Sequence, residues 1–99
     1  MKLHLWTQDQ ENYGTEEQPY WKFKGGEDFF VLPYNDIPAP ALAEMMRPII
    51  EQDNPYFRRQ IVGFEMVEDD YLTEFEQDQL EFDGRIVYPT RVFNLSESA

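Results

Sequence analysis

The chain has 99 residues, with 20 Asp or Glu against eight Lys or Arg, and its formal net charge is −12. So acidic a surface excludes direct binding to DNA or RNA, because phosphate contacts need clustered Lys and Arg. No cysteine is present, which excludes disulfides, thiolate zinc sites and cysteine nucleophiles. The length and the 41% hydrophobic content indicate a single folded domain over residues 1–99.

The first part of the chain predicts strands. Apolar and less apolar side chains alternate over residues 2–6, which is typical of a half-buried strand. After a polar stretch, residues 20–24 and 28–32 alternate in the same way. Gly25 and Gly26 lie between these segments, and glycine accepts the positive φ that tight turns need. We therefore expect a β-hairpin with its turn at the two glycines.

An apolar stripe with helical spacing predicts a helix within residues 35–53. Its members recur at i, i+3, i+4, i+7 and i+8: Leu42, Met45, Met46, Ile49 and Ile50. Pro38 and Pro40 suit the start of a helix. Pro48 removes one helical hydrogen bond, so we expect a kink there or two short helices.

A second helix is predicted to begin at Thr73, because Thr73 and Glu76 fit the S/T-x-x-E capping box, and to end at Gly84. Its apolar side chains fall within about half of the circumference at ~100° per residue: Leu72, Phe75, Leu80 and Phe82. We expect this helix, like the first, to pack on the sheet, through Phe75 and Phe82.

Strands are predicted on both sides of the second helix, over residues 60–67 and 85–95. In the first of these Val62, Phe64 and Met66 share a face. The predicted order is β-β-β-α-β-α-β. The expected fold is α+β, a small and mostly antiparallel sheet with one or two helices packed on one face.

The strongest functional signal is an acidic block: residues 60–84 contain nine acids and no Lys or Arg. Glu74, Asp78 and Glu81 are spaced i+4 and i+3 and so rise ~4.5–6 Å apart along a helix, close to the ~6–7 Å between phosphates of a nucleic-acid strand. The alternative is an ordinary solvent-facing side of an amphipathic helix. We predict partner contacts, with Tyr71 as the apolar anchor, at these residues: Glu65, Glu68, Asp69, Asp70, Tyr71, Glu74, Asp78 and Glu81.

Catalytic and metal-binding signatures are missing from the sequence. His4 is the single histidine, and the serines lie only at Ser96 and Ser98. The tightest acidic cluster, residues 68–70, lacks the ligand spacing of a calcium loop. We therefore predict a protein that is not an enzyme, with no catalytic residue, no metal ligand and no cofactor.

A second candidate site is a polar turn beside aromatic residues, which suits stacking of a small molecule. Its members are Asn12, Tyr13, Tyr20 and Trp21. A turn followed by core aromatics explains the same residues without a ligand. This segment nevertheless leaves open a small ligand-binding or sequestering module.

The same region carries a motif, TQ-x-x-ENYG over residues 7–14, followed after a short spacer by PYWKFKGG over residues 19–26. The motif resembles that of a group of short uncharacterised proteins of tailed bacteriophages, over about a third of the chain. A weaker likeness runs from residue 72 to residue 88, and the spacer, residues 15–18, is shorter than in many relatives. The resemblance carries no assigned activity. It implies a phage protein made in a bacterial cytoplasm, and such proteins often bind host machinery.

Together these patterns predict a non-enzymatic acidic phage protein that binds and inhibits a host protein by imitating nucleic-acid charge. The partner would present a basic surface. A self-associating structural protein is a further alternative, and a homo-oligomer is left open. The start of the chain turns polar too early for a signal peptide, and no apolar run approaches the ~18 residues of a membrane span. We therefore expect the protein to be located in the cytoplasm of the host cell.

Overall fold

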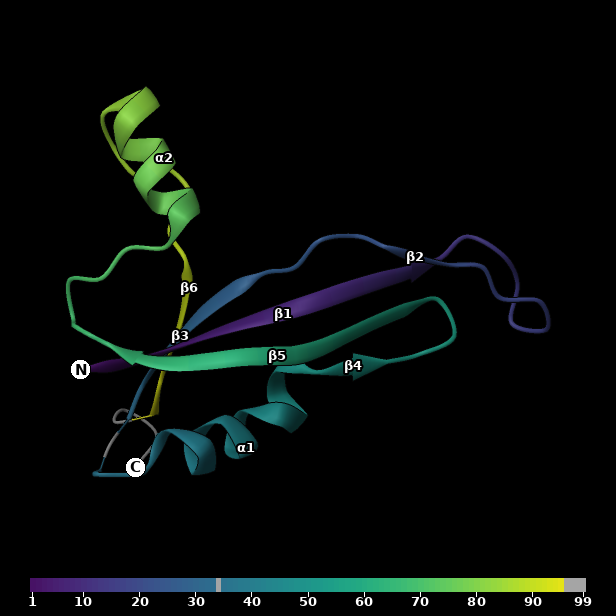
Figure 1. Cartoon of the computed structure of the whole chain (residues 1–99), viewed down its shortest axis with the longest axis horizontal. Helices are drawn as coiled ribbons and strands as arrows, with labels where there is room; N and C mark the ends of the chain where they lie inside the picture. The colour runs from purple at the N-terminus through teal and green to yellow at the C-terminus, as the bar shows by residue number, and fades with distance from the viewer. Residues whose placement is uncertain (34, 96–99) are drawn as a thin grey trace.

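The computed structural model describes residues 1–33 and 35–95 and measures 44 × 36 × 20 Å. The sheet order is β4-β5-β1-β3-β6, with β2 beside β1, and the fold is α+β as predicted, with one further short strand, β4. Every strand pair is antiparallel except β3 with β6. The two helices lie on opposite sides of the sheet, and α2 stands clear of it (Figure 1). The elements are β1 (Lys2–Asn12), β2 (Trp21–Phe23), β3 (Asp28–Leu32), α1 (Ala39–Ile50), β4 (Gln52–Asp53), β5 (Phe57–Val67), α2 (Glu74–Asp83) and β6 (Arg91–Asn94).

The predicted hairpin at Gly25-Gly26 is wrong. β2 and β3 do not pair with each other; both pair with β1, β2 at residues 10–12 and β3 at residues 3–6. The long strand β1 has room for the two short strands end to end along one edge. At Gly25 the chain takes φ 88°, and a Cβ on Gly26 would lie 1.8 Å from the Thr7 carbonyl oxygen. The two glycines therefore let the chain continue from β2 to β3 along the edge of β1 instead of reversing its direction.

The hydrophobic core lies between α1 and one face of the sheet. Its buried members are Leu3, Leu5, Phe29, Val31, Leu42, Ala43, Met46 and Ile50. The predicted stripe is therefore partly wrong, because Met45 and Ile49 are exposed and Ala43 takes an inward position. α1 is one helix that runs through Pro48, with no break into two.

β5 contains an irregularity that alters the predicted face of this strand. Phe64 and Met66 pair with Leu5 and Leu3 on the core side. The register then shifts between Trp6 and Thr7, which leaves Val62 as the extra residue of a bulge. Ile61, and not Val62, packs against the core beyond the shift.

α2 differs most from the expectation. It begins at the Thr73 capping box and ends at Gly84 in the left-handed region, as predicted. Phe75 and Phe82, however, are 58% and 80% exposed and do not pack on the sheet. The predicted last strand is shorter than expected, since residues 84–90 form no strand and lead from α2 to β6.

Candidate functional site

The α2 hairpin, defined here as residues 73–90, is closed by the side chain of Gln79. Gln79 is buried, and its Oε1 accepts hydrogen bonds from the backbone N–H groups of Val87, at 2.8 Å, and Tyr88, at 2.7 Å. Its Nε2 donates to the carbonyl of Tyr88 at 2.9 Å. One amide side chain thus satisfies three backbone groups of the returning segment.

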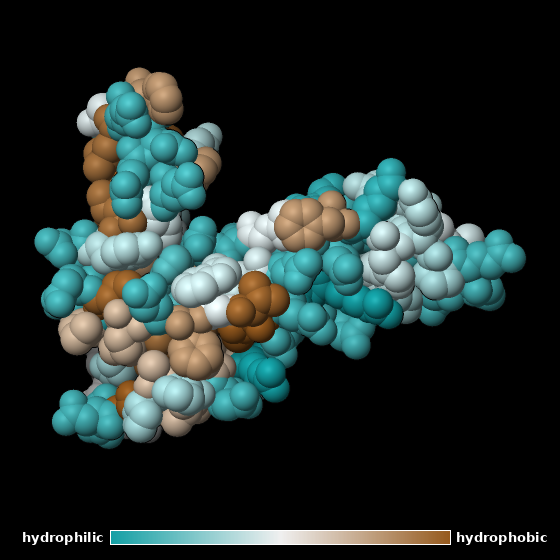
Figure 2. Space-filling view, viewed as in Figure 1, coloured by the Kyte–Doolittle hydropathy of each residue, from teal (hydrophilic) through white to brown (hydrophobic). Residues whose placement is uncertain are grey.

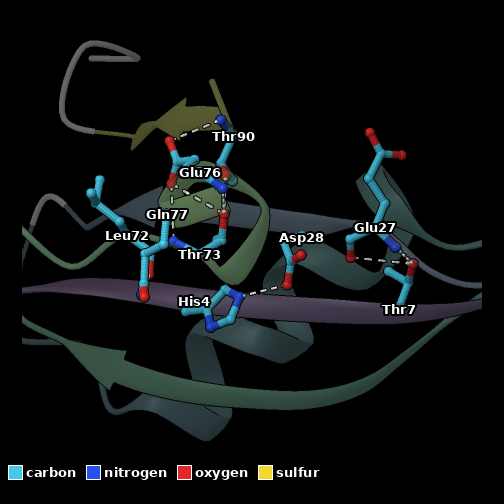
Figure 3. Close-up of polar contacts among 9 residues, drawn as sticks. All are labelled: His4, Thr7, Glu27, Asp28, Leu72, Thr73, Glu76, Gln77 and Thr90. Carbon is cyan, nitrogen blue, oxygen red and sulfur yellow. Dashed lines mark hydrogen bonds and ion pairs between the residues drawn. The ribbon is translucent and has the colours of Figure 1, made fainter. Parts of the chain in front are cut away.

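A second group of hydrogen bonds closes the base of the hairpin (Figure 3). Glu76 accepts from the Thr73 N–H at Oε1 and from the Thr90 N–H at Oε2, both at 3.1 Å. The hydroxyl oxygens of Thr73 and Thr90 are 3.0 Å apart. Burial alone raises the pKa of Glu76, but the hydrogen bonds from Thr73 and Thr90 outweigh it and lower the pKa below its ordinary 4.5.

The face of α2 opposite these contacts is open to solvent and acidic. Glu74, Asp78 and Glu81, called the acidic row below, are all exposed. At ~100° per residue they fall within about 60° of one another. Phe75 and Phe82 lie beside the row, and Figure 2 shows hydrophobic side chains bordering the hydrophilic surface of α2. Among residues 1–33 and 35–95, no ion pair involves an acid of α2.

The other predicted partner-binding residues lie between β5 and α2. Glu68, Asp69 and Asp70 are exposed, and Asp69 lies 3.0 Å from the Met1 amino group. Tyr71 is half-buried, so it is only partly available as an anchor. Glu65 is paired with His4 in the register of β5 and β1.

Glu65 and Tyr71 meet at a hollow of about 370 Å³ on the sheet face opposite α1, called the aromatic hollow below. Trp6 and Asp28 also belong to it, and neither was predicted from the sequence. Strand alternation could have placed them, because His4, Trp6 and Asp28 face away from the core positions Leu3, Leu5 and Phe29. Its lining residues are His4, Trp6, Thr7, Gly26, Glu27, Asp28, Glu65 and Tyr71.

His4 forms the buried floor of the hollow. Its Nε2 lies 2.7 Å from Oδ1 of Asp28 (Figure 3), and its ring centroid lies 5.0 Å from that of Trp6 and 5.4 Å from that of Tyr71. Nδ1 is buried and has no hydrogen-bond partner within residues 1–33 and 35–95. The ring proton therefore belongs on Nε2, where Asp28 accepts it, because a buried N–H without an acceptor is costly.

The second candidate site is occupied by the chain itself. The amide of Asn12 is buried; it donates to the carbonyls of Thr15 and Pro55, and its oxygen accepts from the N–H groups of Gly14 and Tyr20. Asn12 therefore shapes the loop between β1 and β2.

The aromatic members of that site are also in contact with cations of the chain. Arg58 lies over Trp21 at 3.9 Å, and Lys22 lies between 5.3 and 5.4 Å from the rings of Tyr13 and Tyr20. These rings already hold cations, so nothing in this geometry favours a small-molecule site over an ordered loop.

Comparison with known protein families, with curated proteins and with solved structures found no match for this chain. Within the described ranges, no group of three His, Asp or Glu residues is arranged to hold a metal ion. No helix in the same part of the chain is long and apolar enough to cross a membrane.

Proposed function

We propose that this chain is a non-enzymatic binding protein that inhibits a host protein by covering its basic, nucleic-acid-binding surface. The contact is the acidic row of α2, with Phe75 and Phe82 as apolar neighbours. One observation carries the proposal: α2 projects from the sheet with three aligned carboxylates that no cation of the described residues neutralises. A partner with clustered Lys and Arg would supply the missing charge.

The helix dipole favours Glu74, which lies in the first turn of α2, but the stability of the helix does not explain Asp78 or Glu81. Glu74 and Asp78 are like charges at i and i+4, which costs a helix about 0.2–0.5 kcal/mol. Glu81 and Asp83 lie at the negative end of the helix dipole, and the last turn has no basic residue. Asp78 and Glu81 therefore disfavour their own helix and have no ion-pair partner among the described residues, as expected of a contact surface.

The exposed phenylalanines strengthen the proposal. A solubilising surface would surround the carboxylates with polar residues, whereas Phe75 and Phe82 expose more than half of their surface beside them. An apolar anchor beside charged groups is the usual composition of a binding surface. The net charge of −12 would steer a basic partner towards the chain and make the association sensitive to salt.

The proposal is tested by reversing the acidic row. A Glu74→Lys, Asp78→Lys, Glu81→Lys variant and the wild type are each immobilised and exposed to nuclease-treated bacterial lysate at low and at high salt. We expect the wild type to retain a basic protein that elutes as salt rises and that duplex DNA displaces. The lysine variant is expected to retain none of it, since like charges then face each other.

A matched control separates the row from overall acidity. Glu16→Lys, Glu17→Lys, Asp36→Lys changes three exposed acids elsewhere and alters the net charge equally. We expect it to bind as the wild type does. Equal loss in both variants would assign the binding to general acidity, and equal retention would exclude the acidic row as the contact.

A further inference from the structure

We propose that the aromatic hollow is a binding site for a guanidinium or ammonium cation, supplied by an arginine or lysine side chain of the basic partner. The inference rests on the proposed function for the source of the cation, but the site itself rests on other residues. These are Trp6, Tyr71, Asp28 and Glu65, which line the hollow with His4 as its floor.

The walls of the hollow match the chemistry of an organic cation. Cations bind over the faces of tryptophan and tyrosine, and guanidinium groups also pair with carboxylates. Asp28 contributes a carboxylate whose Oδ1 already contacts His4, and Glu65 contributes an exposed carboxylate. Glu27 lines the hollow too, but its carboxylate already lies 2.9 Å from Arg59 and is therefore partly neutralised.

The rings are fixed in place. The Trp6 ring lies against Gly63, where a Cβ would come within 2.1 Å of it, so a larger residue would displace the ring. Tyr71 meets Phe30 edge-on at 6.2 Å, in addition to its contact with His4. A site with rigid walls binds with less loss of conformational entropy.

Other aromatic rings of the chain are in contact with its own cations. Arg58 lies over Trp21 at 3.9 Å and Lys2 over Phe30 at 3.8 Å. Within the described residues no Lys or Arg lies over Trp6 or Tyr71. The hollow thus combines carboxylates with aromatic rings that have no cation over them among the described residues. This composition suits a cation from another molecule.

The hollow also lies next to the α2 hairpin. A second hollow, of about 350 Å³, shares Gly26, Glu27 and Asp28 with it and extends to Phe75 and Tyr88. Arg91 also lines the second hollow. A partner on α2 could therefore reach the aromatic hollow with a long side chain. At about 370 Å³ the volume is at the low end of the range of roughly 300–1,000 Å³ for ligand pockets.

The inference is tested by NMR with small probes. The indole N–H signals of Trp6 and Trp21 are followed while Nα-acetyl-arginine methylamide is added, and agmatine is used in a second titration. We expect the Trp6 signal to move with saturation and the Trp21 signal to stay, since Arg58 already covers Trp21. The citrulline analogue of the capped arginine has the same shape without charge and should move neither. Agmatine carries the same guanidinium with a free ammonium group in place of the capped backbone, so tighter binding of agmatine would overturn a partner side chain as the source in favour of a free small polyamine.

Glu65→Gln is the informative variant, since Glu65 is exposed and only its charge is removed. We expect it to weaken the capped arginine about fivefold or more, whereas the matched Glu68→Gln should have no effect. No movement of Trp6, equal movement of both indoles, or an equal response to citrulline would overturn the inference. Probe binding without any retained basic protein would instead contradict only the proposed function, and the reverse result would contradict only the cation site.

Discussion

α1 is held on the sheet by apolar side chains, whereas α2 is held to residues 84–90 by amide and carboxylate groups. α1 buries Leu42, Met46 and Ile50, and it leaves Met45 and Ile49 in solvent. α2 does the opposite: its buried side chains are polar and its large apolar ones are exposed. A short chain can thus position a helix through the hydrogen bonds of buried polar side chains and keep the largest apolar side chains of that helix exposed.

The largest effect is expected from the apolar side of this comparison. Leu42→Ala should destabilise the whole domain by about 2–5 kcal/mol, because Leu42 is fully buried and the substitution leaves a cavity. For a domain of this size that lowers the Tm by more than about 8 °C in a thermal melt. Met45→Ala, on the exposed side of the same helix, is the control and should change the Tm little. Equal shifts in both variants would show that α1 is not packed as described.

A smaller and local effect is expected when Gln79 is removed. Gln79→Ala leaves two backbone N–H groups and one carbonyl without partners, at about 1–3 kcal/mol for an unsatisfied buried group. The sheet does not depend on Gln79, so the α2 hairpin should open while the Tm of the rest of the domain, called the body below, stays near that of the wild type. Amide hydrogen exchange should accelerate within residues 74–90 and not in β1. Gln77→Ala is the exposed control; uniform acceleration throughout the chain would contradict independent opening of the hairpin.

The carboxylate of Glu76 makes the same opening depend on pH. Its pKa in the folded protein is below 4.5, despite burial, because Thr73 and Thr90 donate hydrogen bonds to it. This contribution is fully present above 4.5 and is lost as pH falls through the lowered pKa. We expect the amide signals of Thr73 and Thr90 to shift on acidification before the sheet unfolds. In Glu76→Gln that transition should be absent, and its persistence would assign it to another acid.

The smallest effect is expected from the exposed phenylalanines. Phe82→Ser should change the free energy of unfolding by no more than about 0.5 kcal/mol, as exposed substitutions commonly do. Phe82 is 80% exposed, so little apolar area is lost from the fold. Chemical denaturation measures this directly. A loss near that of Leu42→Ala would mean that α2 folds back onto the body in solution.

Local signals in the sequence predicted the two helices better than the strands, since β1 extends to Asn12 and β6 covers only Arg91–Asn94. The capping box at Thr73 and the glycine end at Gly84 gave α2 its bounds, because both act on neighbouring backbone groups. The helical period around Leu42 and Met46 similarly predicted α1 and most of its buried side. These signals need no knowledge of the rest of the fold.

Long-range features could not be predicted in the same way. Two adjacent glycines are compatible with a hairpin turn and equally with a chain that continues along the edge of β1. Only the length of β1 decides between these two arrangements. Nor does a helical pattern reveal that Gln79 is buried, because its partners become apparent only when residues 87 and 88 return beside it. Strand alternation could have placed His4, Trp6 and Asp28 on one face, but Glu65 and Tyr71 join them only through long-range pairing, so the aromatic hollow could not be predicted.

The 3.0 Å contact between the hydroxyls of Thr73 and Thr90 means that the chain leaves the body and re-enters it at nearly one point. The strand pairings of the sheet do not fix the length of the segment between these two residues. Insertions or deletions there would leave the pairing of β5 with β1 and of β6 with β3 unchanged, much as loop tips tolerate inserted segments in other folds. In such a chain the projecting part can diverge or be exchanged over generations while the part that folds stays the same.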